Sequence, residues 1–258
     1  MRAHARTAWL PLTQPGESST TLDKFGGAGW FLPRTRHPSC KSCRAPMSLG
    51  LQLRLSTLPP PFLATLRTPV IGAEFLQSLD SIKDIWKLKY DVRRLHTDAV
   101  GEGLFQHFIC KNDACLCESG ITLTSRVLPA SDCRPRSSAD DLPARTITGW
   151  REIVDLPHAV EWKRLGIHLP EEIALRLEDD LDPPDERDKL GGWPHWEQSV
   201  AELHRCHVPW CCDGRPPDFL FQIASNENLP LGFGDEGKAY LFFSACSPPF
   251  QQGVVQYG

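Results

Sequence analysis

Cysteines are the residues of this sequence most able to do chemistry, and the chain has ten of them in 258 residues. Cys40 and Cys43 form a Cys-x-x-Cys knuckle, and Cys110 and Cys115 follow an apolar run. Two thiolate pairs of this kind can surround one Zn²⁺ tetrahedrally. The spacing therefore predicts one structural zinc ion bound by Cys40, Cys43, Cys110 and Cys115, with Cys117 as an alternative to Cys115.

Two other interpretations of the knuckle remain open, a redox pair and buried thiols that act as small hydrophobic side chains. A redox Cys-x-x-Cys usually opens a helix in a βαβ context. Here Pro38 precedes the pair, and Arg44-Ala45-Pro46 and an apolar strand follow it. A closed four-cysteine zinc site would support folding and leave no open position for catalysis.

Four of the remaining cysteines are grouped later in the chain, with two histidines nearby. They are Cys206, Cys211, Cys212 and Cys246, near His204 and His207. Four residues separate Cys206 from Cys211, which differs from the knuckle spacing. The sequence leaves open whether this group binds a second zinc ion or is a decayed site.

A repeated pattern indicates how the chain is organised. Asp23-Lys24-Phe25-Gly26-Gly27 recurs 165 residues later as Asp188-Lys189-Leu190-Gly191-Gly192. Each copy continues to an apolar strand with a glutamine, Gln52 or Gln222, and then to an apolar run ending in Cys110 or Cys246. A cysteine also follows the motif lysine in each copy, with Cys40 16 positions after Lys24 and Cys206 17 positions after Lys189. Gly-Gly turns and apolar strands are common singly, but four features in one order favour an ancestral duplication.

The expected fold class is mainly β (α+β), with two diverged copies of a β-sheet unit packed together and a few short helices. The 23 prolines favour short elements. Helices are expected near 71–80 and 170–180, loops at 57–70 and 131–143, and a link between the copies at 178–187. Strands are expected at 48–55, 104–110, 121–128, 145–154, 218–224, 239–245 and 252–257.

The chain divides on this basis into three parts. Residues 1–20 are expected to be a loosely ordered N-terminus. Residues 21–165 would be the first copy, with the cysteine-rich zinc site. Residues 166–258 would be the second copy, with its Gly-Gly-Trp and Gly-Asp-Glu-Gly motifs.

Several of these motifs resemble known families. The chain is similar to the YwqG-like family of bacterial proteins at Asp188–Trp196, Phe219–Pro230 and Phe233–Gly237. The first half, at Cys40–Cys43, Met47, Gln52 and Phe108–Asn112, also resembles the eukaryotic programmed cell death protein two family. In that family a proline stands where this chain has Asp113.

These resemblances imply a mainly β, duplicated fold. Relatives on the eukaryotic side resemble chaperones that hold a ribosomal protein before assembly. Some bacterial members occur in toxin–antitoxin-like settings. Neither role has a residue signature that can be carried onto this chain, so the functional implication rests on fold analogy.

Catalytic motifs are absent from the sequence, which has no Gly-x-Ser-x-Gly, no phosphate-binding loop and no His-Glu-x-x-His. His195 and Trp196 form part of an aromatic cluster that would be either a ligand surface or buried packing. Asp235 lies in a Gly-rich turn, where it would bind a cation or cap the turn. His195, Trp196, Gln222 and Asp235 are the candidate binding residues.

Gln52 and Gln222 carry a structural hypothesis of their own. Each lies in an apolar strand, where a buried amide must find hydrogen-bond partners. We expect each glutamine to bond to backbone groups of the facing turn, Gly26–Gly27 or Gly191–Gly192.

Charge and hydropathy limit the partners and the cellular compartment that can be expected for this chain. The net charge of −4 argues against nucleic acid, and the lack of a long apolar run argues against a membrane span. No signal peptide is visible, so a cytoplasmic location is expected. Met1–Pro15 is acid-free and carries arginine, which leaves an organelle transit peptide as an alternative.

The function expected from the sequence is a non-catalytic, zinc-stabilised module that binds another protein, chaperone-like or immunity-type, as a monomer. The alternative is a small-ligand binder or enzyme that uses the groove between the two copies, with His195, Trp196 and Asp235 at its mouth.

Overall fold

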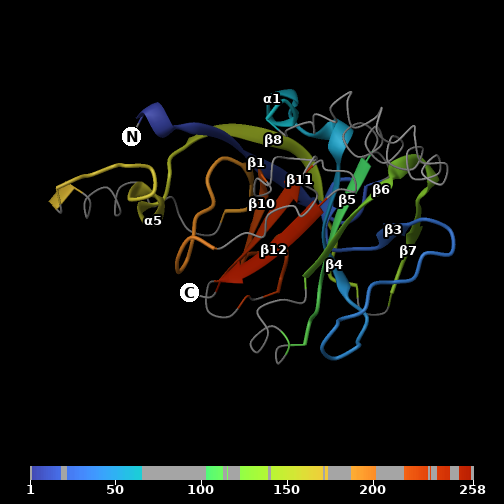
Figure 1. The fold of residues 1–258 in the computed structure, drawn as a ribbon. Coiled ribbons are helices and arrows are strands. Elements are labelled where there is room, and N and C mark those ends of the chain that lie inside the picture. Colours follow the sequence, from blue (N-terminus) through green and yellow to red (C-terminus); the bar gives the residue numbers. More distant parts are fainter. Residues whose placement is uncertain are drawn as a thin grey trace, which may run out of the picture.

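The chain folds around a curled, mainly antiparallel sheet in a computed structural model (Figure 1). The structure describes residues 2–18, 22–65, 103–112, 115, 123–138, 141–170, 172–173, 187–201, 218–231, 233, 237–244 and 250–256. We call the described residues up to 138 the first half and those from 141 onward the second half.

Ten of the described strands form one sheet in the order β12-β11-β10-β9-β1-β8-β2-β4-β5-β6. In the first half these are β1 (Arg6–Pro15), β2 (Lys24–Phe25), β4 (Ser48–Arg54), β5 (Gly103–Ile109) and β6 (Leu123–Pro129). In the second half they are β8 (Arg145–Asp155), β9 (Lys189–Gly191), β10 (Asp218–Ala224), β11 (Lys238–Ser244) and β12 (Phe250–Gln256).

The remaining described elements are short. A two-stranded sheet pairs β3 (Gly29–Phe31) with β7 (Arg134–Arg136). The helices are α1 (Pro60–Leu63) and α5 (Ala159–Trp162), with 3-10 turns η1 (Arg2–His4), η2 (Leu55–Thr57) and η4 (Ala130–Asp132). None of the helices in the described part of the chain combines the length and apolar character needed to cross a membrane.

The two halves exchange strand pairing at the centre of the sheet. β1 and β8 pair along their whole lengths, from Arg6 opposite Asp155 to Pro15 opposite Arg145. β9 of the second half then adds to β1, and β2 of the first half adds to β8. β12 and β6, at the two ends of the order, pack against one another, so the sheet curls on itself.

One apolar core is shared by both halves. Phe25 meets Phe221 edge-on at a ring-centroid distance of 5.9 Å, and Phe105 meets Phe243 at 6.4 Å. These rings come from facing strands of different halves and are fully buried. Burial of such rings contributes a large apolar stabilisation that depends on both halves at once.

The mainly β prediction is confirmed, and all seven predicted strands are present with ends within two residues of those expected. The structure differs at the N-terminus, which was expected to be loosely ordered over 1–20, because Arg6–Pro15 form the central strand β1. The expected loops at 57–70 and 131–143 contain α1, η4 and β7. The helix expected near 71–80, and most of that expected at 170–180, lies outside the described residues.

Candidate metal centre

The knuckle of Cys40 and Cys43 is built by a tight turn between two bridged residues, Ser39 and Pro46. The Cys40 N–H donates to the carbonyl of Ala45 at 2.8 Å, and the Arg44 N–H donates back to the Cys40 carbonyl at 3.0 Å. Arg44 adopts a left-handed backbone with φ of 63°. This reversal brings the Cys43 N–H to 3.4 Å from Cys40 Sγ.

The second cysteine pair is placed by strand β5. β5 pairs with β4 so that Ser48 lies opposite Ile109. Cys110 follows Ile109 directly and therefore leaves the sheet beside the chain that enters β4 from the knuckle. Cys115 is held nearby because its N–H donates to the Asn112 carbonyl at 2.9 Å.

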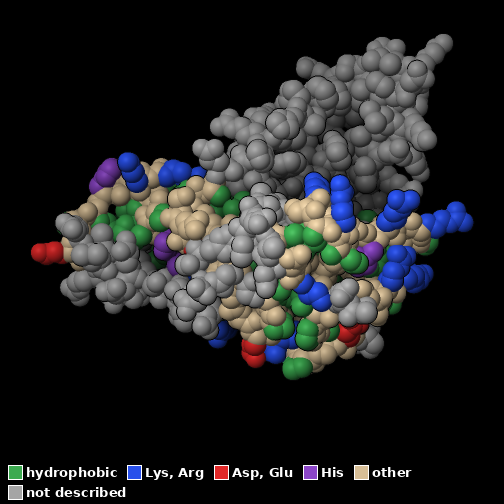
Figure 2. All heavy atoms as spheres, turned by 90° about the horizontal axis from the view of Figure 1, so that it is seen from below, with side chains coloured by type: hydrophobic (Ala, Val, Ile, Leu, Met, Phe, Trp, Pro, Cys, Tyr) green, Lys and Arg blue, Asp and Glu red, His purple; other side chains and the backbone are tan. Residues whose placement is uncertain are grey.

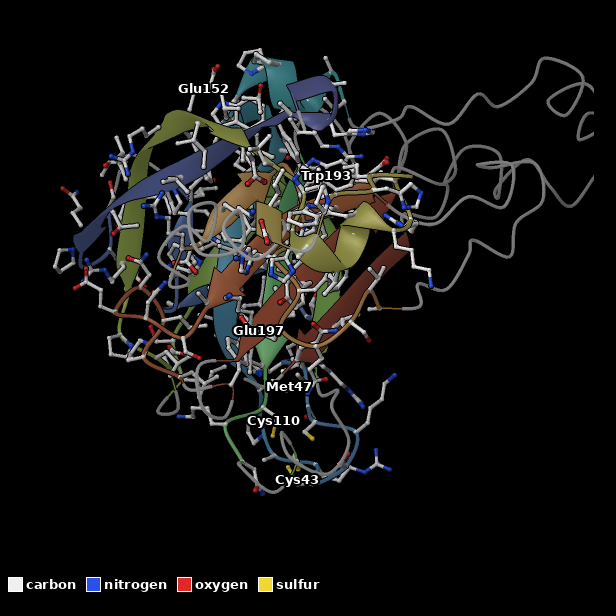
Figure 3. All side chains as sticks on the ribbon, turned by 90° about the vertical axis from the view of Figure 1, so that its left-hand side faces the viewer. Cys43, Met47, Cys110, Glu152, Trp193 and Glu197 are labelled. Atoms are coloured by element: carbon white, nitrogen blue, oxygen red, sulfur yellow. The ribbon has the colours of Figure 1, made fainter. Side chains whose placement is uncertain are left out.

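The four sulfur atoms converge on one point at the lower end of the molecule, as the Cys43 and Cys110 side chains show in Figure 3. All four Sγ atoms lie within 4.8 Å of one another, and Cys43 Sγ is 3.6 Å from Cys110 Sγ. A tetrahedral zinc site with Zn–S bonds of about 2.3 Å requires sulfurs about 3.8 Å apart. The cluster can therefore hold a metal ion of this coordination.

The surroundings of the cluster suit a structural site. Cys40, Cys110 and Cys115 are buried, and Cys43 is half-buried. They pack with Phe31, Met47, Leu49 and Phe108 in one apolar cluster. His37 stacks near this cluster, with its ring centroid 5.2 Å from that of Phe31.

The thiols differ strongly in their acidity. Burial raises the pKa of Cys40, but N–H groups of Cys43 and Ser42 and neighbouring thiols oppose it and bring that pKa down to about 6. Burial, together with the neighbouring cysteines, raises the pKa of Cys115 to about 12. Four thiolates this close repel one another, and a bound cation removes that repulsion.

The other cysteines are separate from this cluster or lie outside the described residues. Cys133 is buried and packs with Leu104 and Ala130. Cys117, Cys206, Cys211, Cys212 and Cys246 lie outside the described residues. The metal-ligand prediction can thus be compared with the structure only at Cys40, Cys43, Cys110 and Cys115, which it brings together.

Gln52 and Gln222 are both buried and make matching hydrogen bonds. Gln52 donates to the Leu22 carbonyl at 2.8 Å and accepts from the Trp30 N–H at 3.1 Å. Gln222 donates to the Arg187 carbonyl at 3.1 Å and accepts from the His195 N–H at 2.9 Å. Each amide therefore clamps the backbone on both sides of its Gly-Gly turn, rather than the two glycines themselves.

A second pair of matching contacts involves an acidic residue in each half. Glu17 accepts from Lys24 Nζ at 3.0 Å and from the Ala28 N–H at 2.7 Å. In the second half, Asp155 accepts from Lys189 Nζ at 2.9 Å and from the Trp193 N–H at 2.7 Å. We call each of these arrangements an acid brace, because it neutralises a buried lysine and fixes the turn that follows it.

Further equivalences extend the match. Asp23 accepts from the Arg54 N–H at 2.6 Å, and Asp188 accepts from the Ala224 N–H at 2.8 Å, in each case two residues beyond the glutamine. Opposite the glutamines, Gln106 donates to the Trp30 carbonyl, and Tyr240 donates to the His195 carbonyl. The strand pairs β4–β5 and β10–β11 also share one bulge, at Leu49/Leu51 and Phe219/Phe221.

Three of the four predicted binding residues contact other residues of the fold. Gln222 forms the clamp above, and Trp196 is 2% exposed with its indole Nε1 donating to Glu161 at 2.8 Å. His195 lies half-buried beside Lys238, whose Nζ is 3.2 Å from His195 Nδ1. Burial and then the Lys238 charge lower the pKa of His195 to about 2. Asp235 lies outside the described residues.

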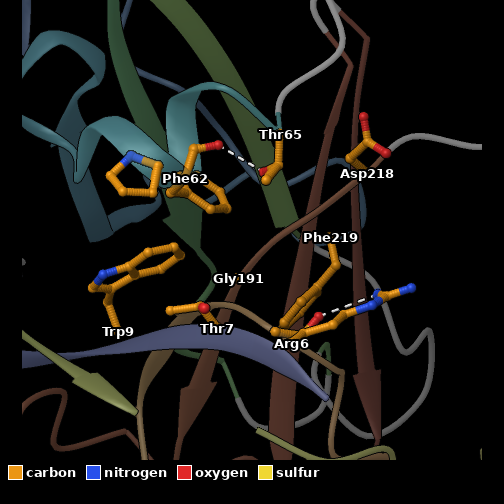
Figure 4. Close-up of a pocket in the computed structure, with 10 residues that line it drawn as sticks. Arg6, Thr7, Trp9, Phe62, Thr65, Gly191, Asp218 and Phe219 are labelled. Carbon is orange, nitrogen blue, oxygen red and sulfur yellow. Dashed lines mark hydrogen bonds between the residues drawn. The ribbon is translucent and has the colours of Figure 1, made fainter. Parts of the chain in front are cut away.

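A cavity of about 420 Å³ opens instead between α1 and the strands β1, β9 and β10 (Figure 4). Trp9 and Phe62 from the first half and Phe219 from the second half form its apolar walls. Arg6 lies at the rim, where its guanidinium stacks 3.4 Å above the Trp193 ring and donates to the Gly192 carbonyl. Neither His195 nor Trp196 lines this cavity.

Sequence reasoning missed Glu17 and Asp155. Glu17 lies seven residues before the lysine that it neutralises, whereas Asp155 lies 34 residues before its lysine. No common spacing to the Asp-Lys-x-Gly-Gly motif therefore marks the two acids. The sequence carries only an indirect signal, the lysine next to an apolar residue in each motif. If that lysine is buried with its neighbour, it needs an acidic partner. A scan of the chain against protein-family models and a search of curated proteins found no match.

Proposed function

We propose that this chain is a non-catalytic module that binds another protein and that one zinc ion stabilises its first half. The closed set of four cysteines carries this proposal. Cys40, Cys43, Cys110 and Cys115 together fill a tetrahedral coordination sphere, and thiolate ligands favour zinc over magnesium or calcium. With no vacant position for water or substrate, such an ion contributes folding energy.

The two halves are also proposed to be diverged copies of one unit. The sheet order reads equivalently from either end, with β1 matching β8, β2 matching β9 and β4 to β6 matching β10 to β12. The clamps and acid braces then fall at equivalent positions. Under this proposal the second unit begins with β8 at Arg145, rather than at residue 166.

The resemblance to the YwqG-like and programmed cell death protein two families agrees with this arrangement, and we propose a distant relationship to them. This relationship favours a chaperone-like or immunity-type role. We propose that the chain acts as a monomer. A cytoplasmic location fits this proposal, because thiols stay reduced there and can bind a metal ion.

Affinity purification of the full chain from its native lysate, followed by mass spectrometry, tests the binding role. We expect a stoichiometric protein partner that the Cys40→Ser/Cys43→Ser variant loses and the Cys133→Ser control retains. Recovery of the full chain alone, at native expression level and low salt, would contradict the proposal.

Small-ligand binding is the second candidate function, and the cavity lined by both halves favours it. Thr65 is exposed at its rim, so Thr65→Trp should fill the opening without disturbing the core. A compound that raises the melting temperature of the natural chain but not of Thr65→Trp would support this function. Equal shifts in both proteins would place the compound elsewhere.

A further inference from the structure

Among the described residues, positive charge is concentrated at the end of the molecule that carries the four-cysteine cluster. Among the described residues from 24 to 138, Asp132 is the only acidic one, although the whole chain has a net charge of −4. Seven exposed cations lie in this region, and we call them the basic face. They are Arg34, Arg36, Lys41, Arg44, Lys111, Arg134 and Arg136.

The fold gathers these cations from three separate segments. The pairing of β3 with β7 places Arg134 opposite Phe31 and Arg136 opposite Gly29. Arg136 also donates to the Thr35 carbonyl at 2.8 Å, which ties it to the loop that carries Arg34 and Arg36. That loop leads directly into the knuckle. The convergence of the four cysteines brings together the two segments that carry Lys41, Arg44 and Lys111.

The charge of this face is largely uncompensated within the described part of the chain. Arg34, Arg36, Lys41, Arg44, Arg134 and Arg136 form no ion pair there. Figure 2 looks onto this end of the molecule and shows Lys and Arg side chains gathered on one side of it. A cluster of exposed like charges raises the local potential and attracts a ligand of opposite sign.

We infer that the basic face binds an acidic segment of a partner protein. This inference rests on the proposed protein-binding function and names the chemistry of the partner. The described residues favour protein over nucleic acid because the basic face includes no exposed Phe, Tyr or Trp side chain that could stack on a base. The net negative charge of the chain also opposes a long polyanion more than a short acidic peptide.

Fluorescence anisotropy with a labelled peptide of about ten Asp and Glu residues tests this directly. The variant Arg34→Glu/Arg36→Glu reverses two exposed charges of the basic face. The matched control is Arg151→Glu/Lys163→Glu, which makes the same charge change at exposed positions of the second half. Circular dichroism and zinc content establish that both variants are folded.

We expect the natural chain and the control to bind the peptide with similar affinity and the basic-face variant to bind at least about tenfold more weakly. Affinity should also fall as salt rises from about 50 to 300 mM. Absence of peptide binding, or equal loss in both variants, would overturn the inference. Tighter binding of a duplex RNA or of anionic vesicles of equal charge at the same salt would overturn it too.

The binding role itself is judged separately. If affinity purification yields a stoichiometric partner that Arg34→Glu/Arg36→Glu still binds, the basic face is not the binding site. The proposed protein-binding function then stands. If no partner is captured and the peptide does not bind, both fail.

Discussion

Gln52 is the residue whose replacement tests the backbone clamp most simply. Gln52→Leu keeps the volume but leaves the part-buried Trp30 N–H and Leu22 carbonyl without their amide partner. We expect the free energy of unfolding to fall by about 2 to 4 kcal/mol. Urea denaturation measures it, with Gln14→Leu, at an exposed position of β1, expected to change it by less than about 0.5 kcal/mol. Equal effects in the two variants would refute the clamp.

His195 predicts how stability depends on pH. Burial and then the Lys238 charge depress the pKa of His195 to about 2, whereas an unfolded histidine titrates near 6.5. The contribution of His195 to the free energy of unfolding is therefore fully present above about pH 6.5. It is lost as pH falls, because only the unfolded state takes up the proton. Between pH 6 and 4 we expect His195→Gln to reduce the slope of unfolding free energy by about 1 kcal/mol per pH unit. Parallel profiles would contradict this.

Single residues also mark where prediction from sequence succeeds. The sequence predicted that the four cysteines of the cluster lie together, because cysteine ligands of zinc sites come in pairs whose spacing is visible in the chain. Gln52 and Gln222 were found because an amide in an apolar strand needs partners. Trp196 and His195 were predicted to bind a ligand, but in the structure both pack against neighbouring residues. The sequence does not reveal whether such a side chain will be covered by the rest of the fold.

Among the secondary-structure elements, the Gly-Gly turns depend on more than backbone conformation. Gly192 has φ of 76°, and a Cβ there would collide with the Asp155 carboxylate of the acid brace. Gly166 has φ of 69° but faces open space. The strain of a left-handed alanine should cost about 1 to 2 kcal/mol at both positions. We expect Gly192→Ala to cost at least about 2 kcal/mol more than Gly166→Ala in urea denaturation. Similar losses would show that the brace is not needed.

The elements that sequence reasoning missed are those with the weakest local signal. Strand β1 contains Pro11 and ends at Pro15, and proline usually argues against a central strand. β2 and β9 are only two and three residues long, so their pairing is fixed by the turn and the neighbouring strands rather than by periodicity. The long apolar strands β4, β10 and β11 carry their own signal and were found.

In the whole molecule, the strand exchange makes each half depend on the other. β1 lies between β8 and β9 of the second half, and the shared core joins Phe25 to Phe221. We therefore expect fragments 1–140 and 141–258 to remain unfolded when expressed separately and to gain structure when mixed. Heteronuclear NMR spectra test this, and a well-dispersed spectrum of fragment 1–140 alone would contradict it.

The zinc content of the purified full chain tests the central claim most directly. We predict that the Cys40→Ser/Cys43→Ser variant contains one zinc ion fewer per chain than the natural protein, because two of its four ligands are gone. The Cys133→Ser control removes a buried thiol outside the cluster and should retain the natural zinc content. An unchanged zinc content in Cys40→Ser/Cys43→Ser, or no zinc in the natural protein, would contradict the account.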